Sequence, residues 1–339
     1  MQTETFPPVL AVGTFVVDYH KVLDHYPQER GGARVLREQI SNGGAPFNLL
    51  VNLARLGVGF PLHAAAKVGR DLDGQYVLEC CSKYGIDTTQ LIGVEGASTG
   101  YTDVFTVERT GQHTCFHCCG IGDTFSRKDV KLKAIQPKLL FLGSLGALGK
   151  LDNHNPSYGR NGATQLLRDA RKQGITTVVE IAPIQRSATL DDFTESLAQA
   201  DYLVINDRLA EKLTSIELYT DGHFDPEHAK AAAELLMQQG LRKAVIIRAS
   251  VGAVYLGADG HFEKQAGYLL PSSQRLGSAG VDHAFCAGFI EGLYHEKPVE
   301  LCLKQGLAAV TCCRRNLTPS DGIPELGECL EFYDALASA

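Results

Sequence analysis

The stretch GSAGVDHAFCAGF, residues 277–289, combines a glycine-rich loop with titratable side chains at the start of a predicted helix. Such a loop presents backbone N–H groups to an anion, and the helix dipole adds positive potential there. Gly280 and its neighbours are therefore candidates for an anion hole that stabilises the charge of a transferring phosphate. A carboxylate or imidazole beside that hole would accept the proton of an attacking hydroxyl. This chemistry nominates Asp282 and His283 as catalytic residues.

The same stretch also has a structural interpretation. Asp282 is of a type that often caps a helix N-terminus, and the helical pattern HAFCAGFIEGL follows it directly. His283 would then lie in the first turn of that helix. The local sequence leaves both interpretations open.

A second glycine-bearing turn lies in NGGAPFNLLVNLARLG, residues 42–57. Gly43 and Gly44 allow the backbone to approach a ligand closely. The carboxamide of Asn48 can both donate and accept hydrogen bonds. Taken alone, the stretch also fits a plain turn from a strand into a helix that ends at Gly57.

Other chemistry-bearing stretches are weaker candidates. CFHCCG at residues 115–120 holds three thiols and an imidazole, but structural zinc sites generally use two ligand pairs separated by a folded loop. Adjacent residues of a strand also point to opposite faces, so we predict thiols on a strand here and assign no metal ligand. Near another strand end, Arg186 is compatible with a phosphate contact or with an ordinary surface position.

The elements that would position these residues alternate between strand and helix. Apolar runs predict buried strands at residues 8–18, 61–69, 138–143, 176–182, 201–206 and 243–248. Amphipathic helical patterns lie between them, for example at 162–174, 191–200 and 226–240. Continuously apolar strands separated by such helices predict an α/β fold with a mostly parallel sheet covered by helices on both faces. We expect one domain over residues 1–339.

The alternation of strand and helix is interrupted at residues 15–42 and 99–118. Both alternate polar and apolar residues, as half-exposed antiparallel strands do, and the second contains a hairpin with RTGQ at its turn. We predict that they meet as a small β-sheet lid. A lid over the carboxyl ends of the parallel strands would cover the edge where open α/β sheets bind ligands.

Composition excludes several classes of protein. The 339 residues are 44% hydrophobic and 21% charged, with a net charge of −7 and no basic block, which argues against nucleic-acid binding. No apolar run reaches the roughly 18 residues of a membrane span, and we see no signal peptide. The ten cysteines include three adjacent pairs and others in apolar runs, a pattern typical of buried thiols in a reducing compartment. We therefore expect a cytoplasmic protein with no membrane partner.

Taken together, the two glycine motifs resemble those of the PfkB/ribokinase family of carbohydrate kinases. The first family motif is a Gly-Gly pair followed by an Asn-bearing helix that ends in Leu-Gly, as at Gly43, Gly44 and Asn48. The second reads Asp-Thr-Thr-Gly-Ala-Gly-Asp-Ala-Phe followed by x-Ala-Gly-Phe, and residues 284–289, AFCAGF, match its tail. AVGTFVVD resembles the family's first strand, with Asp18 at the sugar-binding aspartate.

This resemblance implies a ribokinase-like fold and transfer of the ATP γ-phosphate, assisted by Mg²⁺, to a hydroxyl of a sugar or nucleoside. The substrate would lie under the lid, held by Asp18, Gly43, Gly44 and Asn48. DYLVIN resembles the strand that enters the family's Asn-x-x-Glu motif, and IIRASVGAVYL resembles its nucleotide-side turn. Nucleotide-binding roles follow for Asn206, Arg248 and Gly252. The resemblance also implies a homodimer formed through the lids.

Four departures from the family pattern concern the transfer chemistry and the nucleotide turn. His283 stands at the position of the family's catalytic Asp, and Asp282 stands at a glycine of its anion hole. Leu209 replaces the glutamate that organises the magnesium waters, and Ala249 replaces a glycine of the nucleotide turn. Two hypotheses follow. Either His283, or Asp282 after a one-residue slip of the loop, is the base of an active kinase, or the chain is a catalytically weakened pseudokinase that binds a sugar or nucleotide as a sensor or partner protein.

Overall fold

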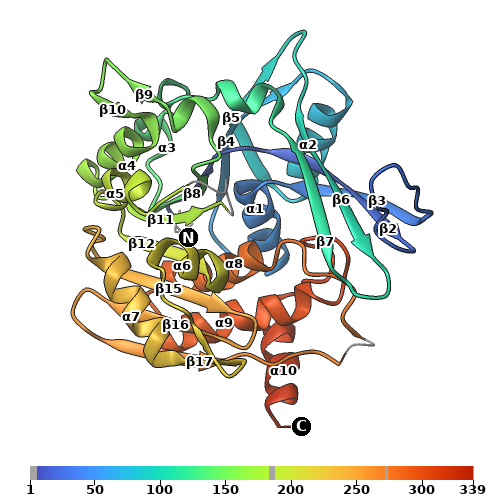
Figure 1. Ribbon diagram of the computed structural model, residues 1–339. Helices are drawn as coiled ribbons and strands as arrows, with labels where there is room; N and C mark the ends of the chain where they lie inside the picture. The colour runs from blue at the N-terminus through green and yellow to red at the C-terminus, as the bar shows by residue number, and fades with distance from the viewer. Residues whose placement is uncertain (1–5, 183–187, 272–273, 339) are drawn as a thin grey trace, which may run out of the picture.

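The computed structural model describes residues 6–182, 188–271 and 274–338 (Figure 1). Its centre is a nine-stranded sheet of order β17-β16-β15-β12-β11-β8-β1-β4-β5. The seven strands from β15 to β5 are parallel, as predicted, whereas β16 and β17 form an antiparallel outer edge. The bounds are β1 Val9–Val12, β4 Leu62–Gly69, β5 Ile86–Val94, β8 Leu139–Leu145, β11 Thr176–Ile181, β12 Tyr202–Asn206, β15 Ala244–Ala249, β16 Gly252–Gly257 and β17 Phe262–Ala266.

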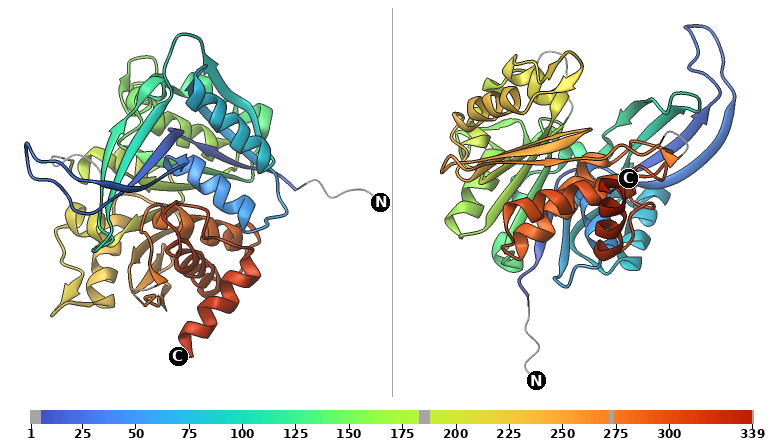
Figure 2. Two further views of the ribbon diagram at one scale, coloured as in Figure 1. Left: turned by 90° about the vertical axis from the view of Figure 1, so that its right-hand side faces the viewer. Right: turned by 90° about the horizontal axis from the view of Figure 1, so that it is seen from below.

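Helices cover both faces of this sheet (Figures 1 and 2). Alternate residues of each central strand point to opposite faces. Val9 and Ala11 belong to one apolar core, whereas Leu10 and Val12 belong to the other. The first core is closed by α1 Ala45–Arg55, α2 Leu72–Lys83, α8 Val281–Tyr294, α9 Val299–Cys313 and α10 Leu326–Ala337. The second is closed by α3 Leu132–Ile135, α4 Gly162–Lys172, α5 Asp191–Leu197, α6 Asp207–Thr214 and α7 Pro226–Met237.

A second sheet of four strands, called the lid here, has the order β3-β2-β6-β7. Its strands are β2 Val16–Leu23, β3 Val35–Gly43, β6 Gly100–Val107 and β7 His113–Cys118. They come from the two predicted excursions. The β2–β3 and β6–β7 pairs are antiparallel as expected, but β2 and β6 pair in parallel. Figure 2 shows the β2–β3 hairpin extending beyond the rest of the molecule.

The prediction of a single strand over residues 8–18 is wrong. The chain leaves the main sheet after β1 and enters the lid as β2, with the break at Gly13. Gly13 has φ of 145°, and a Cβ there would lie 2.9 Å from the carbonyl oxygen of Gly143. This glycine therefore allows the lid to begin directly at the carboxyl end of a central strand.

Shorter elements complete the description. They are the 3-10 turns η1 Gly120–Thr124, η2 Arg127–Asp129 and η3 Gly149–Leu151, and the two-residue strand pairs β9 His154–Asn155 with β10 Arg160–Asn161 and β13 Tyr219–Thr220 with β14 His223–Phe224. Within the described ranges, no helix is both long and apolar enough to cross a membrane.

Candidate functional site

The lid contributes Asp18, which is only 8% exposed on β2. It pairs in register with Thr102 on β6, whose hydroxyl forms a side-chain hydrogen bond with the carboxyl group. Burial disfavours the charged form and raises the pKa of Asp18 to about 7, although the bond from Thr102 acts in the opposite direction. Near neutral pH this carboxyl group can therefore both donate and accept hydrogen bonds.

Gly43 and Gly44 bring the end of β3 and the start of α1 against the base of the lid. A Cβ on Gly43 would lie 2.1 Å from Oδ1 of Asp18. Gly44 has φ of 82°, and a Cβ there would lie 2.1 Å from the carbonyl oxygen of Thr14. A Cβ at Gly43 would displace the carboxyl group of Asp18, and one at Gly44 would require a backbone shift. The pair therefore places Asp18 beside the N-terminus of α1.

Asn48, in the first turns of α1, links the lid side of the site to α8. Its Oδ1 accepts a hydrogen bond of 2.6 Å from Nδ2 of Asn42, which also donates to Oγ of Ser320 at 2.9 Å. Its Nδ2 lies 3.2 Å from Nδ1 of His283. Because an amide nitrogen can only donate, Nδ1 of His283 is the acceptor in this arrangement, and the ring proton resides on Nε2.

His283 lies on α8 and is half-buried. Desolvation lowers the pKa of the imidazole to about 4, although the adjacent Asp282 carboxylate acts to raise it. The ring is therefore neutral at physiological pH. With its Nδ1 lone pair engaged by Asn48, it offers the site a hydrogen-bond donor at Nε2.

Asp282 joins Arg248 and Asn206 in a charge network. Nε of Arg248 donates to Oδ1 of Asp282 at 2.6 Å, a second guanidinium nitrogen completes the ion pair, and Nδ2 of Asn206 donates to Oδ2 at 3.3 Å. Burial acts to raise the pKa of Asp282, but Arg248, the neighbouring imidazole and these hydrogen bonds hold it below its usual range. Asp282 is therefore an ionised carboxylate paired with Arg248.

Strand alternation explains why these groups meet. Ala244 and Ile246 pack into the core shared with α8, so Arg248, two residues farther along β15, points to the same face. Arg248 is 6% exposed, and the first turn of α8 brings Asp282 to it. The N-cap of α8 is Gly280, with φ of 73°, and Asp282 makes no capping hydrogen bond. The interpretation of Asp282 as the N-cap is therefore wrong.

The remaining predicted residues have packing roles in this structure. A Cβ on Gly280 would lie 2.1 Å from Cβ of Pro319, and one on Gly252 would lie 2.6 Å from the carbonyl oxygen of Gln265. Leu209 is 6% exposed and belongs to the apolar core beneath α6. Its backbone N–H donates to Oδ1 of Asn206 at 2.9 Å, so Asn206 caps α6.

Several participants were not predicted from the sequence. Asn42 and Ser320 belong to the same hydrogen-bond network, and Arg314, 8% exposed, donates to the carbonyl oxygen of Ser250 in the turn after β15. The SNGG turn contains Asn42, but no local pattern marks the other two. The predicted phosphate contact Arg186 lies outside the described residues.

The lid also touches the glycine loop. Nδ1 of His113 lies 3.0 Å from Oγ of Ser278, and Nε2 of Gln39 donates to Oδ2 of Asp321 at 3.0 Å. These contacts connect strands β7 and β3 to the segments beside α8. The site is thus a polar network that runs from the lid, through Asn48 and His283, to the ends of β12 and β15.

Comparisons with known proteins agree with this architecture. The profile of the pfkB family carbohydrate kinases matches residues 9–325. A 5-dehydro-2-deoxygluconokinase of Geobacillus kaustophilus (strain HTA426) is 24% identical over 335 residues, covering 96% of this chain and 93% of the relative. A deoxyribokinase of Salmonella typhi is 22% identical over 301 residues, covering 88% and 90%.

Solved structures show the same fold. Arabidopsis thaliana ribokinase, complexed with ribose and ATP, superposes with a TM-score of 0.77 at 19% identity, covering 97% of this chain and 99% of that one. Giardia lamblia ribokinase gives a TM-score of 0.78 at 18% identity, covering 97% and 100%. The resemblance and the ribokinase-like fold predicted from the sequence are therefore confirmed, and the chain belongs to the PfkB family of carbohydrate kinases.

Proposed function

We propose that this chain binds a sugar, or a nucleoside through its sugar, beneath the lid, and that it transfers phosphate from ATP only weakly. In this proposal it is a pseudokinase that acts as a sensor or a partner protein. The observation that carries the proposal is the ion pair between Asp282 and Arg248, with Nε and Oδ1 2.6 Å apart at the N-terminus of α8.

This ion pair opposes binding of a transferring phosphate. An anion hole works by aiming uncompensated positive potential at developing negative charge. Here the carboxylate of Asp282 adds its own negative charge at the helix N-terminus and neutralises Arg248, the buried cation that faces it. A γ-phosphate would have to displace Asp282 or approach it against like-charge repulsion.

Leu209 and Asp282 do not fit the family's magnesium ion. Mg²⁺ requires oxygen ligands or waters held by oxygen-bearing side chains. Leu209 offers neither and is packed into the core, and Asp282 is already engaged by Arg248 and Asn206. We therefore derive no step of a mechanism through a magnesium–ATP complex.

The lid side supports binding. Asp18 and Asn48 present donors and acceptors within a buried, sterically defined corner, as recognition of hydroxyl groups requires. Nε2 of His283 adds a donor. Because the ring pKa is about 4, His283 is a weak base, and its Nδ1 lone pair is occupied by Asn48.

An active kinase is the second candidate. The imidazole of His283 is neutral and stands at the family's catalytic position, so it would accept a proton if a bound substrate displaced Asn48 from Nδ1. The names of the relatives indicate which ligands to test, namely 5-dehydro-2-deoxygluconate and deoxyribose.

The test measures binding and turnover together. Calorimetry with 5-dehydro-2-deoxygluconate, deoxyribose, ribose and inosine identifies the ligand, and release of ADP from Mg-ATP measures transfer. We expect binding that Asp18→Asn weakens, with turnover far below the roughly 1–100 s⁻¹ of typical kinases. The triple substitution Leu209→Glu, Asp282→Gly and His283→Asp should raise turnover on the bound ligand. Wild-type turnover in the usual kinase range that His283→Ala abolishes would refute the pseudokinase proposal.

We also propose that two chains pair through their lids. The supporting observation is a set of large apolar side chains exposed on the lid, among them Ile40 at 52% and Phe116 at 53%. Exposed apolar patches of this kind commonly mark interaction surfaces. Light scattering should report a dimer that Ile40→Glu dissociates, and a monomeric wild-type chain would contradict the proposal. A cytoplasmic location stays a prediction from the sequence.

A further inference from the structure

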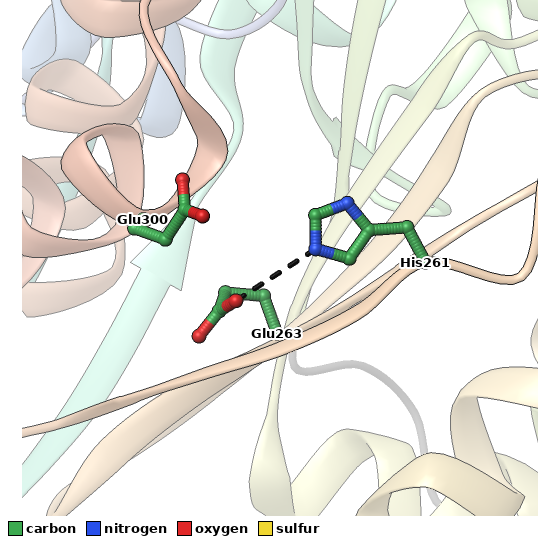
Figure 3. Close-up of side chains that lie close together, drawn as sticks. All are labelled: His261, Glu263 and Glu300. Atoms are coloured by element: carbon green, nitrogen blue, oxygen red, sulfur yellow. Dashed lines mark ion pairs between the residues drawn. The ribbon is translucent and has the colours of Figure 1, made fainter.

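Far from the lid, three potential metal ligands converge where the outer edge of the main sheet meets α9. They are His261 in the turn between β16 and β17, Glu263 on β17, and Glu300 in the first turn of α9. One ligating atom from each lies within 4.8 Å of the others (Figure 3). β16 runs away from the candidate functional site, so His261, which lies beyond its far end, is roughly 17 Å from Gly252, whereas Glu263 pairs with Tyr255 in the middle of β16.

Local structure holds the imidazole in place. The carbonyl oxygen of His261 accepts from the backbone N–H of Gly257 at 2.8 Å, and its own N–H donates to Oδ1 of Asp259 at 3.0 Å. The ring packs edge-on against Tyr255, with centroids 6.0 Å apart. Nε2 of His261 lies 3.7 Å from Oε2 of Glu263, which is the dashed contact in Figure 3.

Neither Lys304 nor Lys264, each close in sequence to one of these carboxylates, compensates their charge. Lys304, one helical turn after Glu300, would be its usual partner, but Nζ of Lys304 instead lies 2.7 Å from Oδ1 of Asp334 on α10. Lys264 follows Glu263 on β17, so its side chain points to the opposite face of the sheet. The two carboxylates together carry a charge of −2, which matches a divalent cation.

A second histidine–glutamate pair provides the contrast. Nε2 of His295 also lies 3.7 Å from a carboxylate oxygen, that of Glu291. There, however, Nζ of Lys297 lies 2.8 Å from Oε2 of Glu291, and Nε2 of Gln305 donates to the same oxygen at 2.7 Å. A lysine and an amide thus compensate Glu291, whereas in the cluster at β17 a second carboxylate takes that place.

We propose that His261, Glu263 and Glu300 bind one divalent transition-metal cation of the Zn²⁺ or Co²⁺ type. One nitrogen and two oxygens are a donor set that Zn²⁺ accepts in tetrahedral sites, with water in the fourth position. Bonds of about 2.0–2.2 Å place ligand atoms roughly 3.3 Å apart, so the His261–Glu263 pair needs only a small side-chain adjustment. The cation fastens the antiparallel edge of the sheet to the N-terminus of α9.

The experiment titrates the full chain with Co²⁺ and follows binding by calorimetry, thermal unfolding and the visible spectrum. We expect one site per chain, a higher unfolding temperature with Co²⁺, and no thiolate charge-transfer absorption, which distinguishes this site from the ten cysteines. His261→Ala and Glu300→Gln should each weaken binding by at least the 10- to 100-fold that loss of an outer-shell partner costs. His295→Ala is the matched control and should leave affinity unchanged.

Because His261 and Glu300 are exposed, their replacement should not unfold the chain, and circular dichroism without metal checks this. Unchanged Co²⁺ affinity in both variants would overturn the proposal. Thiolate absorption that persists in His261→Ala would overturn it as well. The outcome is independent of sugar binding and phosphate transfer, because no residue of the cluster belongs to the candidate functional site.

Discussion

The two halves of the candidate functional site differ in how their polar groups are used. On the lid side, Asp18 and the amides of Asn42 and Asn48 form a compact, uncharged or weakly charged corner. On the side formed by α8 and β15, called the transfer side here, Asp282 and Arg248 are both charged and neutralise each other. The comparison teaches that two parts of one polar network can differ, since the lid side relies on hydrogen bonds between amides whereas Asp282 and Arg248 satisfy each other's charge.

The difference has a physical origin in desolvation. A buried neutral group needs only hydrogen bonds, which a hydroxyl-rich ligand and the protein can share. A buried charge needs a counter-charge, so Arg248 and Asp282 depend on each other whether or not a ligand is present. The predictions below are ordered from the largest expected effect to the smallest.

Asp18 should make the lid side sensitive to pH. Its pKa is raised from 3.8 to about 7 in the folded chain, so its contribution to stability is complete below about pH 4 and is lost as pH rises toward 7. At about 1.4 kcal/mol per pKa unit, the loss is about 4 kcal/mol. Urea unfolding at several pH values should show Asp18→Asn gaining stability relative to wild type as pH rises. A pH-independent difference would contradict the burial of an ionisable Asp18.

On the transfer side, Arg248→Met should lower the free energy of unfolding by about 2 to 3 kcal/mol, because it leaves the carboxylate of Asp282 without its counter-charge. The additional substitution Asp282→Gly should recover most of that loss. Arg70→Met is the control, since its pair with Glu95 is exposed and should contribute less than about 1 kcal/mol. If Arg248→Met and Arg70→Met had equal effects, the internal neutralisation of the transfer side would be wrong.

Gly44→Ala tests whether close backbone packing at Gly44 shapes the lid side. The backbone at Gly44, with φ of 82°, and the 2.1 Å approach to the oxygen of Thr14 should cost about 2 kcal/mol. Gly327→Ala is the matched control, because no atom lies within 4 Å of its added Cβ and alanine is favoured inside α10 by up to about 1 kcal/mol. Thermal unfolding compares the two, and a neutral Gly44→Ala would remove the steric argument.

The smallest expected effect concerns the hydrogen bond between Asn42 and Ser320, which supports the lid side. Ser320→Ala removes the hydroxyl that accepts from Asn42 at 2.9 Å in a buried environment. We expect a loss of about 1 kcal/mol in unfolding free energy and weaker ligand binding, since Asn42 also orients Asn48. Ser338→Ala, at the exposed end of α10, should change neither quantity. Equal behaviour of the two serine variants would show that Ser320 does not support the network.

Much of the fold could be predicted because it follows local rules. Continuous apolar runs and amphipathic helices indicated the parallel sheet, and alternating segments indicated the lid. The break at Gly13 was not predicted, because the residue pattern of an apolar run does not show whether the run stays in one sheet or passes into another. The parallel pairing of β2 with β6 was also missed, since strand pairing depends on how the intervening chain crosses over.

For the site, residue types were predictable and partners were not. Gly43, Gly44 and Asn48 share a short motif, so their proximity follows from their spacing. Asp282 and Arg248 are 34 residues apart, and Asn42 and Ser320 are 278 apart. No local pattern indicates such pairs.

The sequence by itself indicated a mostly parallel sheet, a small lid and the chemical groups of the candidate site, because secondary structure follows from periodicity and turns. Only the tertiary structure decided how those groups are used. It pairs Asp282 with Arg248, makes His283 a neutral donor and raises the pKa of Asp18. The reason is that ionisation and ion pairing depend on desolvation and on neighbours brought together by folding, neither of which is a property of a residue's position in the chain.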